Sequence, residues 1–256
     1  MEGVEQIILP NEKLHPDLLS SIVKVKGKCY VKNTLCDIPI EVLPEGECSN
    51  NTFLNRSYLY KKTEYDKCIK EENYKDIFIL LDKQYHMSFF LKWYKEIYNT
   101  YGDKKYYELL GQTLTYVDHH HPYKHHYHKL LYTGSNPLLM MNSKERVKYN
   151  KLPSFINIFR GVSSDIRLTK NNFQSFVGNS WTLDKEKSIW FSTNYIHSVD
   201  KPNHYIFSYM IPKSEVLSYF TDRKEDEIFV DYNRLNFDNI VMYTVKTKTS
   251  PFQKNE

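Results

Sequence analysis

The chain has 256 residues, of which 41% are hydrophobic and 15% aromatic, with a formal net charge of +4. This composition is that of a globular protein with a sizeable core, which excludes a mainly disordered chain. No apolar run reaches the roughly 18 residues of a membrane span, and no basic stretch followed by an apolar one opens the chain, so we expect a cytoplasmic protein without membrane contact. The four cysteines form no CxxC pair, so we expect reduced thiols and no zinc site among them.

Residues 1–62 are predicted to form a small accessory region that is partly β. Residues 22–32 alternate between apolar residues and lysines, the pattern of a half-buried strand or hairpin. The row of lysines is either the solvated face of that strand or a surface that contacts phosphates. Residues 37–43 are predicted to form another short strand, and residues 52–60 a third.

Residues 63–150 are predicted to form the helical part of the main domain. From residue 73 onward, apolar and aromatic side chains recur at the spacing of an amphipathic helix. Gly102 is predicted to end one helix and Asp103 to cap the next, because glycine favours helix C-termini and aspartate favours N-caps. Ser143 is predicted to cap a further short helix.

Six histidines stand between His119 and His128. Such a density is able to bind a divalent metal, but no cysteine or carboxylate pattern completes a site. Pro122 also interrupts the helical pairing of His121 with His125. We therefore predict no metal here and favour a solvated, pH-sensitive segment that makes polar contact with a partner.

From Phe155 the pattern changes to short β-like runs. These runs are residues 155–161, 190–192, 204–210, 227–231 and 239–246. A short capped helix is predicted at residues 214–220. A helical front half followed by a β-rich back half predicts an α+β domain, with residues 63–256 as the main domain and residues 151–256 as its β-rich core.

A charged loop followed by a short strand spans residues 219–231. Alternation along the strand places Glu225 and Glu227 on one face and turns Ile228 into the core. Two neighbouring carboxylates oppose each other's ionisation, which makes them candidates for chemistry on a sugar or a proton. The alternative interpretation is a solvated acidic turn that closes a hairpin.

Two fragments precede this segment in the chain. Arg160-Gly161 ends one predicted strand, and Ser180-Trp181-Thr182 forms a polar strand before a helix. Arg160 has two donors for the oxygens of a diphosphate, and Gly161 allows a ligand to approach the backbone. Ser180 and Thr182 share a strand face. Taken alone, the first fragment also fits a surface turn, and Thr182 also fits a helix cap.

An arginine on the first core strand, a Ser-x-Ser/Thr strand and an E-x-E turn follow one another in this order. In this respect, and in the flanks of the three motifs, the chain resembles the R-S-E class of mono-ADP-ribosyltransferases of bacterial and phage toxin type, over residues 137–247. The resemblance implies an ADP-ribosyltransferase-like split β core that binds NAD as its substrate. Residues 1–130 carry no comparable resemblance.

The resemblance also implies roles for single residues. The expected catalytic residues are Arg160, Ser180, Glu225 and Glu227. The expected NAD-binding residues are Arg160, Gly161, Ser180, Thr182, Phe191 and Tyr195. The carboxylate of Glu227 would stabilise the positive charge that builds on the ribose as nicotinamide leaves, and Glu225 would face the acceptor. We expect guanidinium, hydroxyl and carboxylate to converge on one cleft.

The expected activity is transfer of ADP-ribose from NAD to a macromolecule. The acceptor is protein arginine, as the glutamate at position 225 suggests by analogy, or RNA or DNA, which the lysines, histidines and tyrosines would suit. Water as acceptor would make the protein an NAD glycohydrolase, and a non-enzymatic binding or phage structural protein is a third interpretation. The resemblance further implies a toxin of a toxin–antitoxin or phage-defence system with a neutralising partner, for which residues 1–130 are the hypothesised docking region.

Overall fold

The computed structural model describes residues 13–20, 22–25, 28–33, 38–41, 51–81, 83–116, 124–195, 198–221 and 226–245. The predicted catalytic residue Glu225 and the histidines at 119–121 lie outside the described residues, as do the side chains of the predicted lysine row. The chain divides into two compact units, residues 1–100 and residues 101–256.

The first unit begins with a short helix and a three-stranded antiparallel sheet. These elements are α1 (Pro16–Ser20), β1 (Ile22–Val25), β2 (Lys28–Asn33) and β3 (Ile38–Glu41), and the strands lie in the order β1-β2-β3. The predicted hairpin at residues 22–32 and the predicted strand at residues 37–43 are therefore confirmed. The alternating pattern was sufficient there because the side chains of a strand repeat every second residue.

The predicted strand at residues 52–60 is wrong, because these residues belong to helix α2 (Asn51–Lys70). The buried residues of α2 are Asn55, Tyr58, Tyr65 and Cys68. Their separations of three or seven residues bring them onto one side of a helix, whereas a strand would alternate. The local aromatic content favours a strand, and packing along the helix overrides that preference.

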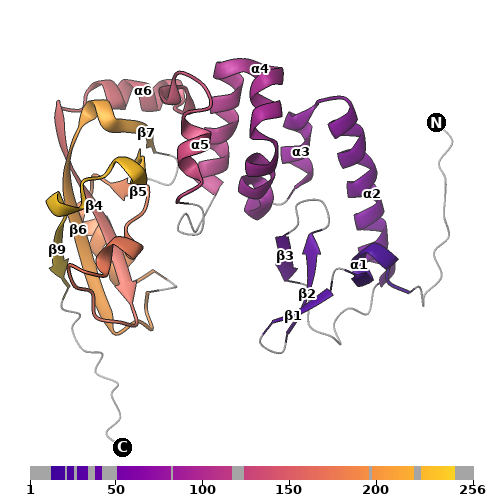
Figure 1. Ribbon diagram of the computed structural model, residues 1–256, viewed down its shortest axis with the longest axis horizontal. Helices are drawn as coiled ribbons and strands as arrows, with labels where there is room; N and C mark the ends of the chain where they lie inside the picture. The colour runs from indigo at the N-terminus through magenta and orange to yellow at the C-terminus, as the bar shows by residue number, and fades with distance from the viewer. Residues whose placement is uncertain are drawn as a thin grey trace, which may run out of the picture. The chain divides into compact units, whose positions relative to one another are not determined.

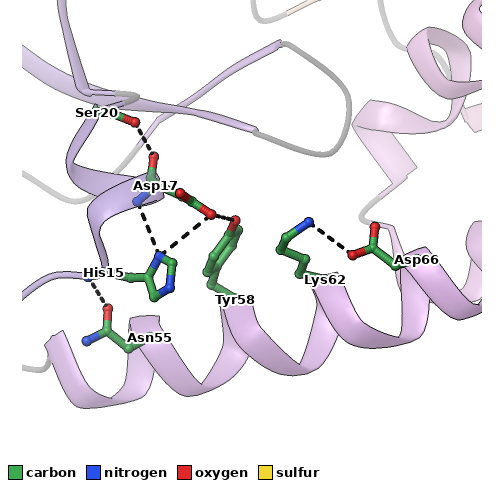
Figure 2. A network of polar contacts seen from close by, with 7 residues as sticks. All are labelled: His15, Asp17, Ser20, Asn55, Tyr58, Lys62 and Asp66. Carbon is green, nitrogen blue, oxygen red and sulfur yellow. Dashed lines mark hydrogen bonds and ion pairs between the residues drawn. The ribbon is translucent and has the colours of Figure 1, made fainter.

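Helix α2 also holds the segment that precedes the first strand, through a network of polar contacts (Figure 2). Asn55 accepts the backbone N–H of His15 at 2.7 Å and donates to the carbonyl of Lys13 at 2.9 Å. The hydroxyl of Tyr58 donates to the carboxylate of Asp17 at 2.6 Å. The buried amide of Asn55 thus replaces the backbone partners that this irregular segment lacks.

Helices α3 (Tyr74–Leu80) and α4 (His86–Tyr116) follow, and the boundary between the two units lies within α4. The predicted helix end at Gly102 with a new cap at Asp103 is wrong, because α4 continues through both residues. Gly102 nevertheless has a φ of 67°, in the left-handed region that glycine tolerates. Gly102, which predicted a helix end, therefore marks a local departure from helical backbone within a continuous helix.

The second unit contains a six-stranded antiparallel sheet and three further helices (Figure 1). The helices are α5 (Tyr127–Leu131), α6 (Ser143–Asn150) and α7 (Lys185–Thr193). The strands are β4 (Phe155–Ser164), β5 (Ser180–Thr182), β6 (Asn203–Pro212), β7 (Val216–Phe220), β8 (Glu227–Val230) and β9 (Val241–Thr244). Their order is β7-β8-β5-β4-β6-β9, and the α+β class is confirmed.

Short 3-10 helices occur in both units. In the first unit, Lys83–Tyr85 precedes α4. Those described in the second unit are Pro137–Met140, Phe173–Phe176, Lys213–Glu215, Tyr232–Arg234 and Phe237–Asn239. Helix α6 is capped by Asn142 and not by Ser143 as predicted, since the Asn142 side chain accepts the backbone N–H groups of Lys144 and Glu145. Asparagine is an equally good cap, so the prediction was displaced by one residue.

Four predicted β runs are confirmed, as strands β4, β6, β8 and β9. The run at residues 190–192 is wrong, because it lies inside helix α7. The helix predicted at residues 214–220 is also wrong, because Val216–Phe220 forms strand β7 and all five of its residues are buried. A strand that is buried on both faces shows no alternation, and its apolar run does not differ from that of a buried helix.

The core of the second unit lies on one face of this sheet. Strand β4 contributes Ile156, Ile158 and Val162, every second residue, and β8 contributes Ile228 and Val230. The loop from residue 165 to residue 179 contributes buried apolar residues to the same cluster. The other face of β4 packs against helix α7.

Candidate active site

The six-stranded sheet is divided at its centre. Strand β4 pairs with β6 along ten residue pairs, but with β5 at the single pair Phe159–Thr182. Strand β5 in turn pairs with β8 at three positions. The sheet therefore consists of two three-stranded halves, β7-β8-β5 and β4-β6-β9, joined at one residue pair. We call this place the junction, and the described residues of the three predicted motifs lie beside it.

Arg160 follows Phe159 on β4 and bridges the junction. Its Nη1 donates to the carbonyl oxygen of Ser180 at 2.6 Å. The guanidinium thus satisfies a β5 carbonyl just where the β4–β5 pairing stops, as buried backbone acceptors require. Gly178 packs against the same guanidinium, because a Cβ at that position would lie 3.1 Å from Nη2. Arg160 is therefore held between two strands that scarcely pair.

The electrostatic environment of Arg160 is unusual for an arginine. Its Nε is buried and has no hydrogen-bond partner among the residues that the structure describes. Burial lowers the pKa of Arg160 to about 10, and the carboxylate of Glu227 acts in the opposite direction. The group stays cationic at neutral pH, and Glu227 is the carboxylate whose field reaches it.

Thr182, rather than Ser180, lies directly opposite Glu227. The register pairs Thr182 with Glu227 and Ser180 with Phe229. Cross-strand partners project on the same face, so both hydroxyls share a face with Glu227, and Ser180 is its diagonal neighbour. Helix α7 is capped by Asp184 and not by Thr182, since Asp184 accepts two backbone N–H groups of the first turn.

The guanidinium, hydroxyl and carboxylate that were expected to converge on one cleft do not project from one face of the sheet. Arg160 alternates with Phe159 and Gly161, and it therefore projects on the side of Ile158 and Val162, which belong to the core. Ser180 and Glu227 project on the opposite side. Arg160 consequently reaches β5 through the Ser180 backbone rather than through its hydroxyl. The three residues share the junction but not a sheet face.

Gly161 has a packing role that the sequence did not indicate. A Cβ at this position would lie 1.9 Å from the carbonyl oxygen of Ser188 and 2.8 Å from the amide nitrogen of Ser192. Helix α7 therefore packs with its backbone directly on β4. The close approach predicted at Gly161 is that of a helix, and contact of its backbone with a ligand stays a prediction.

Phe191 and Tyr195 belong to an aromatic group at the end of helix α7. Their ring centroids are 5.7 Å apart, and Trp190 lies 5.2 Å from Phe191, both pairs in edge-to-face arrangement. Trp190 is 49% exposed. The predicted stacking of Phe191 or Tyr195 on nicotinamide stays a prediction, and the observed contacts of both rings are with other aromatic rings.

The residue before Glu227, Asp226, is fixed from several elements. Its φ of 45° is left-handed. The hydroxyl of Tyr219 donates to its carboxylate at 2.6 Å, and the amines of Lys148 and Lys187 lie 3.9 and 4.0 Å away. Its carbonyl accepts the backbone N–H of Leu183 at 3.1 Å. Strand β7, helix α6, helix α7 and the end of β5 therefore all position the start of strand β8.

The described histidines of the histidine-rich segment are exposed, and two of them contact residues of the second unit. His128 Nδ1 lies 2.7 Å from the carboxylate of Asp231, whose side chain is only 1% exposed. His125 packs edge-on against Tyr232, with centroids 5.2 Å apart. No group of three or more potential metal ligands occurs among the described residues. His125 and His128 are therefore solvent-exposed and also make specific contacts, with Tyr232 and Asp231.

No family model, no curated protein and no solved structure matches this chain. Within the described ranges, no helix combines the length and apolar character that crossing a membrane requires. The functional interpretation therefore depends on the residues at the junction and on the order of their motifs.

Proposed function

We propose that this protein is a mono-ADP-ribosyltransferase that cleaves NAD and transfers ADP-ribose to a macromolecule. The observation that carries the proposal is the bridge from Arg160 to Ser180 across a divided sheet, within reach of the charge of Glu227. The resemblance to the R-S-E class implies a split β core, and a sheet of two halves supports that expectation. The motif residues lie beside that junction although they are far apart in the chain.

The chemistry follows from the side chains. Arg160 would hold the diphosphate of NAD, because its guanidinium is cationic and its Nε has no acceptor among the described residues. The hydroxyls of Ser180 and Thr182 would orient the nicotinamide ribose and Glu227. When the bond between nicotinamide and C1′ breaks, its electron pair leaves with nicotinamide, and the Glu227 carboxylate stabilises the resulting positive charge. The acceptor then attacks C1′ and loses its proton, to Glu225 in this proposal.

The acceptor is protein arginine or a nucleic acid such as RNA, and water is the alternative that would make the protein an NAD glycohydrolase. The proposed setting is a toxin of a toxin–antitoxin or phage-defence system, with a neutralising partner. A non-enzymatic protein on the same fold would bind without consuming NAD. Labelled NAD separates these cases, since nuclease sensitivity, protease sensitivity or free ADP-ribose identifies the acceptor.

The proposal is tested by NAD consumption with purified full-length protein. Glu227→Gln is expected to slow consumption by about a hundredfold to a thousandfold, the usual cost of losing a preorganised charge-stabilising group. Glu186→Gln is the matched control, since Glu186 is exposed on helix α7. If Glu227→Gln consumes NAD as fast as the control, or if the unaltered protein consumes none, the proposal is wrong.

A further inference from the structure

A buried lysine lies beside the junction, and the proposed reaction does not use it. Lys124 is 5% exposed. Its Nζ donates to the carbonyl oxygens of Ser175 at 2.9 Å and Val177 at 3.5 Å, and lies 4.5 Å from the ring centroid of Tyr232. The ion pairs of the described residues involve other cations. Lys124 is thus a buried ammonium without a carboxylate partner among those residues.

Lys124 and Arg160 hold the same short segment of chain. Lys124 donates to the carbonyls of Ser175 and Val177. Arg160 packs against Gly178 and donates to the carbonyl of Ser180. Burial lowers the pKa of Lys124, and the charge of Arg160 lowers it further, so the two cations repel each other. Both side chains contact the six-residue stretch from Ser175 to Ser180, and the charge of Arg160 reaches Lys124.

Two neighbouring cations need more negative charge than this environment supplies. A buried charge is stable only when it is paired, because desolvation costs several kcal/mol for an isolated ion. Glu227 acts on Arg160, but neither Arg160 nor Lys124 forms an ion pair with any residue that the structure describes. The buried Nε of Arg160 is in addition a donor without an acceptor there. An anion at this place would satisfy both deficits.

We infer that Lys124 and Arg160 are the two cations of one anion subsite, which takes the diphosphate of a dinucleotide. Arg160 offers the diphosphate its Nε, which has no acceptor among the described residues, and Lys124 supplies the second positive charge while its ammonium stays bound to Ser175 and Val177. A diphosphate suits the pair because it places two negative charges on adjacent groups. The choice of ligand depends on the proposed function, whereas the subsite itself is testable without catalysis.

Inorganic pyrophosphate is the probe, titrated calorimetrically into the full-length protein. Lys124→Met is expected to weaken its binding by about tenfold or more, because it removes one unit of positive charge close to a partly buried anion. Lys124→Arg, which keeps the charge, is expected to bind more tightly than Lys124→Met. Lys144→Met, on the exposed face of helix α6, is the control and should bind as the unaltered protein does.

The outcomes are separable. The inference is overturned if the unaltered protein does not bind pyrophosphate, or if a folded Lys124→Met binds it equally well, which would leave Lys124 a purely structural tether. Where Lys124→Met does not fold, Lys124→Arg decides, because loss of binding with the charge retained would contradict the inference. Pyrophosphate binding that requires Lys124, without NAD consumption, supports the subsite and refutes the transferase. If NAD consumption depends on Glu227 but Lys124→Met binds pyrophosphate as well as the unaltered protein does, the transferase is supported and the subsite is refuted.

Discussion

Glu145 connects helix α6 to the residue that follows strand β7. Its Oε1 accepts the backbone N–H of Thr221 at 3.0 Å, and its Oε2 accepts the backbone N–H of Asn142 at 2.9 Å. The residue is only 2% exposed. One carboxylate therefore completes the capping box of α6 and also fixes the backbone that leads toward the E-x-E segment.

Replacing this carboxylate should destabilise the protein markedly. Glu145→Ala leaves two backbone donors without their acceptor, and a buried unsatisfied group costs about 1–3 kcal/mol. We expect the free energy of unfolding to fall by about 2–4 kcal/mol, measured by urea denaturation. Glu186→Ala, at an exposed position of helix α7, should change it by no more than about 0.5 kcal/mol. Equal effects of the two substitutions would contradict the role given to Glu145.

Two glycines should be sensitive to alanine for different reasons. Gly161→Ala places a Cβ 1.9 Å from a carbonyl of helix α7, so the helix must move away from β4. At Gly102 the added carbon meets no atom within 4 Å apart from the local backbone of its own helix, and the φ of 67° is what opposes the substitution. We expect about 1–2 kcal/mol of destabilisation at Gly102 from the left-handed backbone, and a larger loss at Gly161.

Thermal unfolding of the two variants provides the measurement. Gly102→Asn is the control for the backbone effect, because asparagine tolerates left-handed φ better than alanine and should recover part of the stability. The packing explanation for Gly161 fails if its alanine variant is as stable as the unaltered protein.

Tyr219 should make stability decrease at alkaline pH. Burial raises its pKa above the ordinary value of 10.0, and its hydrogen bond to the carboxylate of Asp226 adds to the shift. The folded state therefore keeps a proton that the unfolded state loses, so the contribution is full below pH 10 and is lost as pH rises above it. Tyr219→Phe should show a smaller decrease of unfolding free energy from about pH 10 upward.

The comparison requires denaturation curves at several pH values for both proteins. Tyr243→Phe, at a position 50% exposed on strand β9, is the control and should retain the alkaline decrease of the unaltered protein. Parallel curves for Tyr219→Phe and the unaltered protein would show that Tyr219 does not cause the decrease.

Asp226 has a left-handed backbone conformation and forms surface ion pairs, and two substitutions at this position distinguish their contributions to stability. Asp226→Asn keeps the tolerance for positive φ but loses the ion pairs with Lys148 and Lys187, which at 3.9 and 4.0 Å are worth about 1 kcal/mol or less. Asp226→Val adds a β-branched side chain at a φ of 45° and should cost about 1–3 kcal/mol more. A valine variant as stable as the asparagine variant in urea would rule out backbone strain at this position.

The elements that the sequence predicted correctly are those whose burial alternates or repeats clearly. Strand β4 is an example, since Ile156 and Ile158 are buried while Phe155 and Asn157 are exposed. Strand β7 was missed because all five of its residues are buried. Helix α2 was mistaken for a strand because its aromatic residues favour β structure locally, and only its tertiary contacts show the helical spacing.

The candidate site shows the same limit. The order of the motifs predicted which residues would lie on neighbouring strands, but not that Arg160 would project on the core side of β4. Lys124 was not predicted at all, because the carbonyls that it binds are 51 and 53 positions away in the chain. The contacts of Asp226 were not predicted either, since its partners on α6 and α7 are distant in sequence. Long-range partners leave no periodic signal.

The single pair between β4 and β5 also has a consequence for local opening. Ladder hydrogen bonds resist separation along the ten pairs of β4 and β6, whereas a single residue pair opposes it between β4 and β5. Backbone amides that border this seam should therefore exchange with deuterated solvent through low-energy fluctuations, well before those of the β4–β6 ladder. A molecule bound across the seam would slow that exchange and make the two parts of the sheet unfold as one cooperative block.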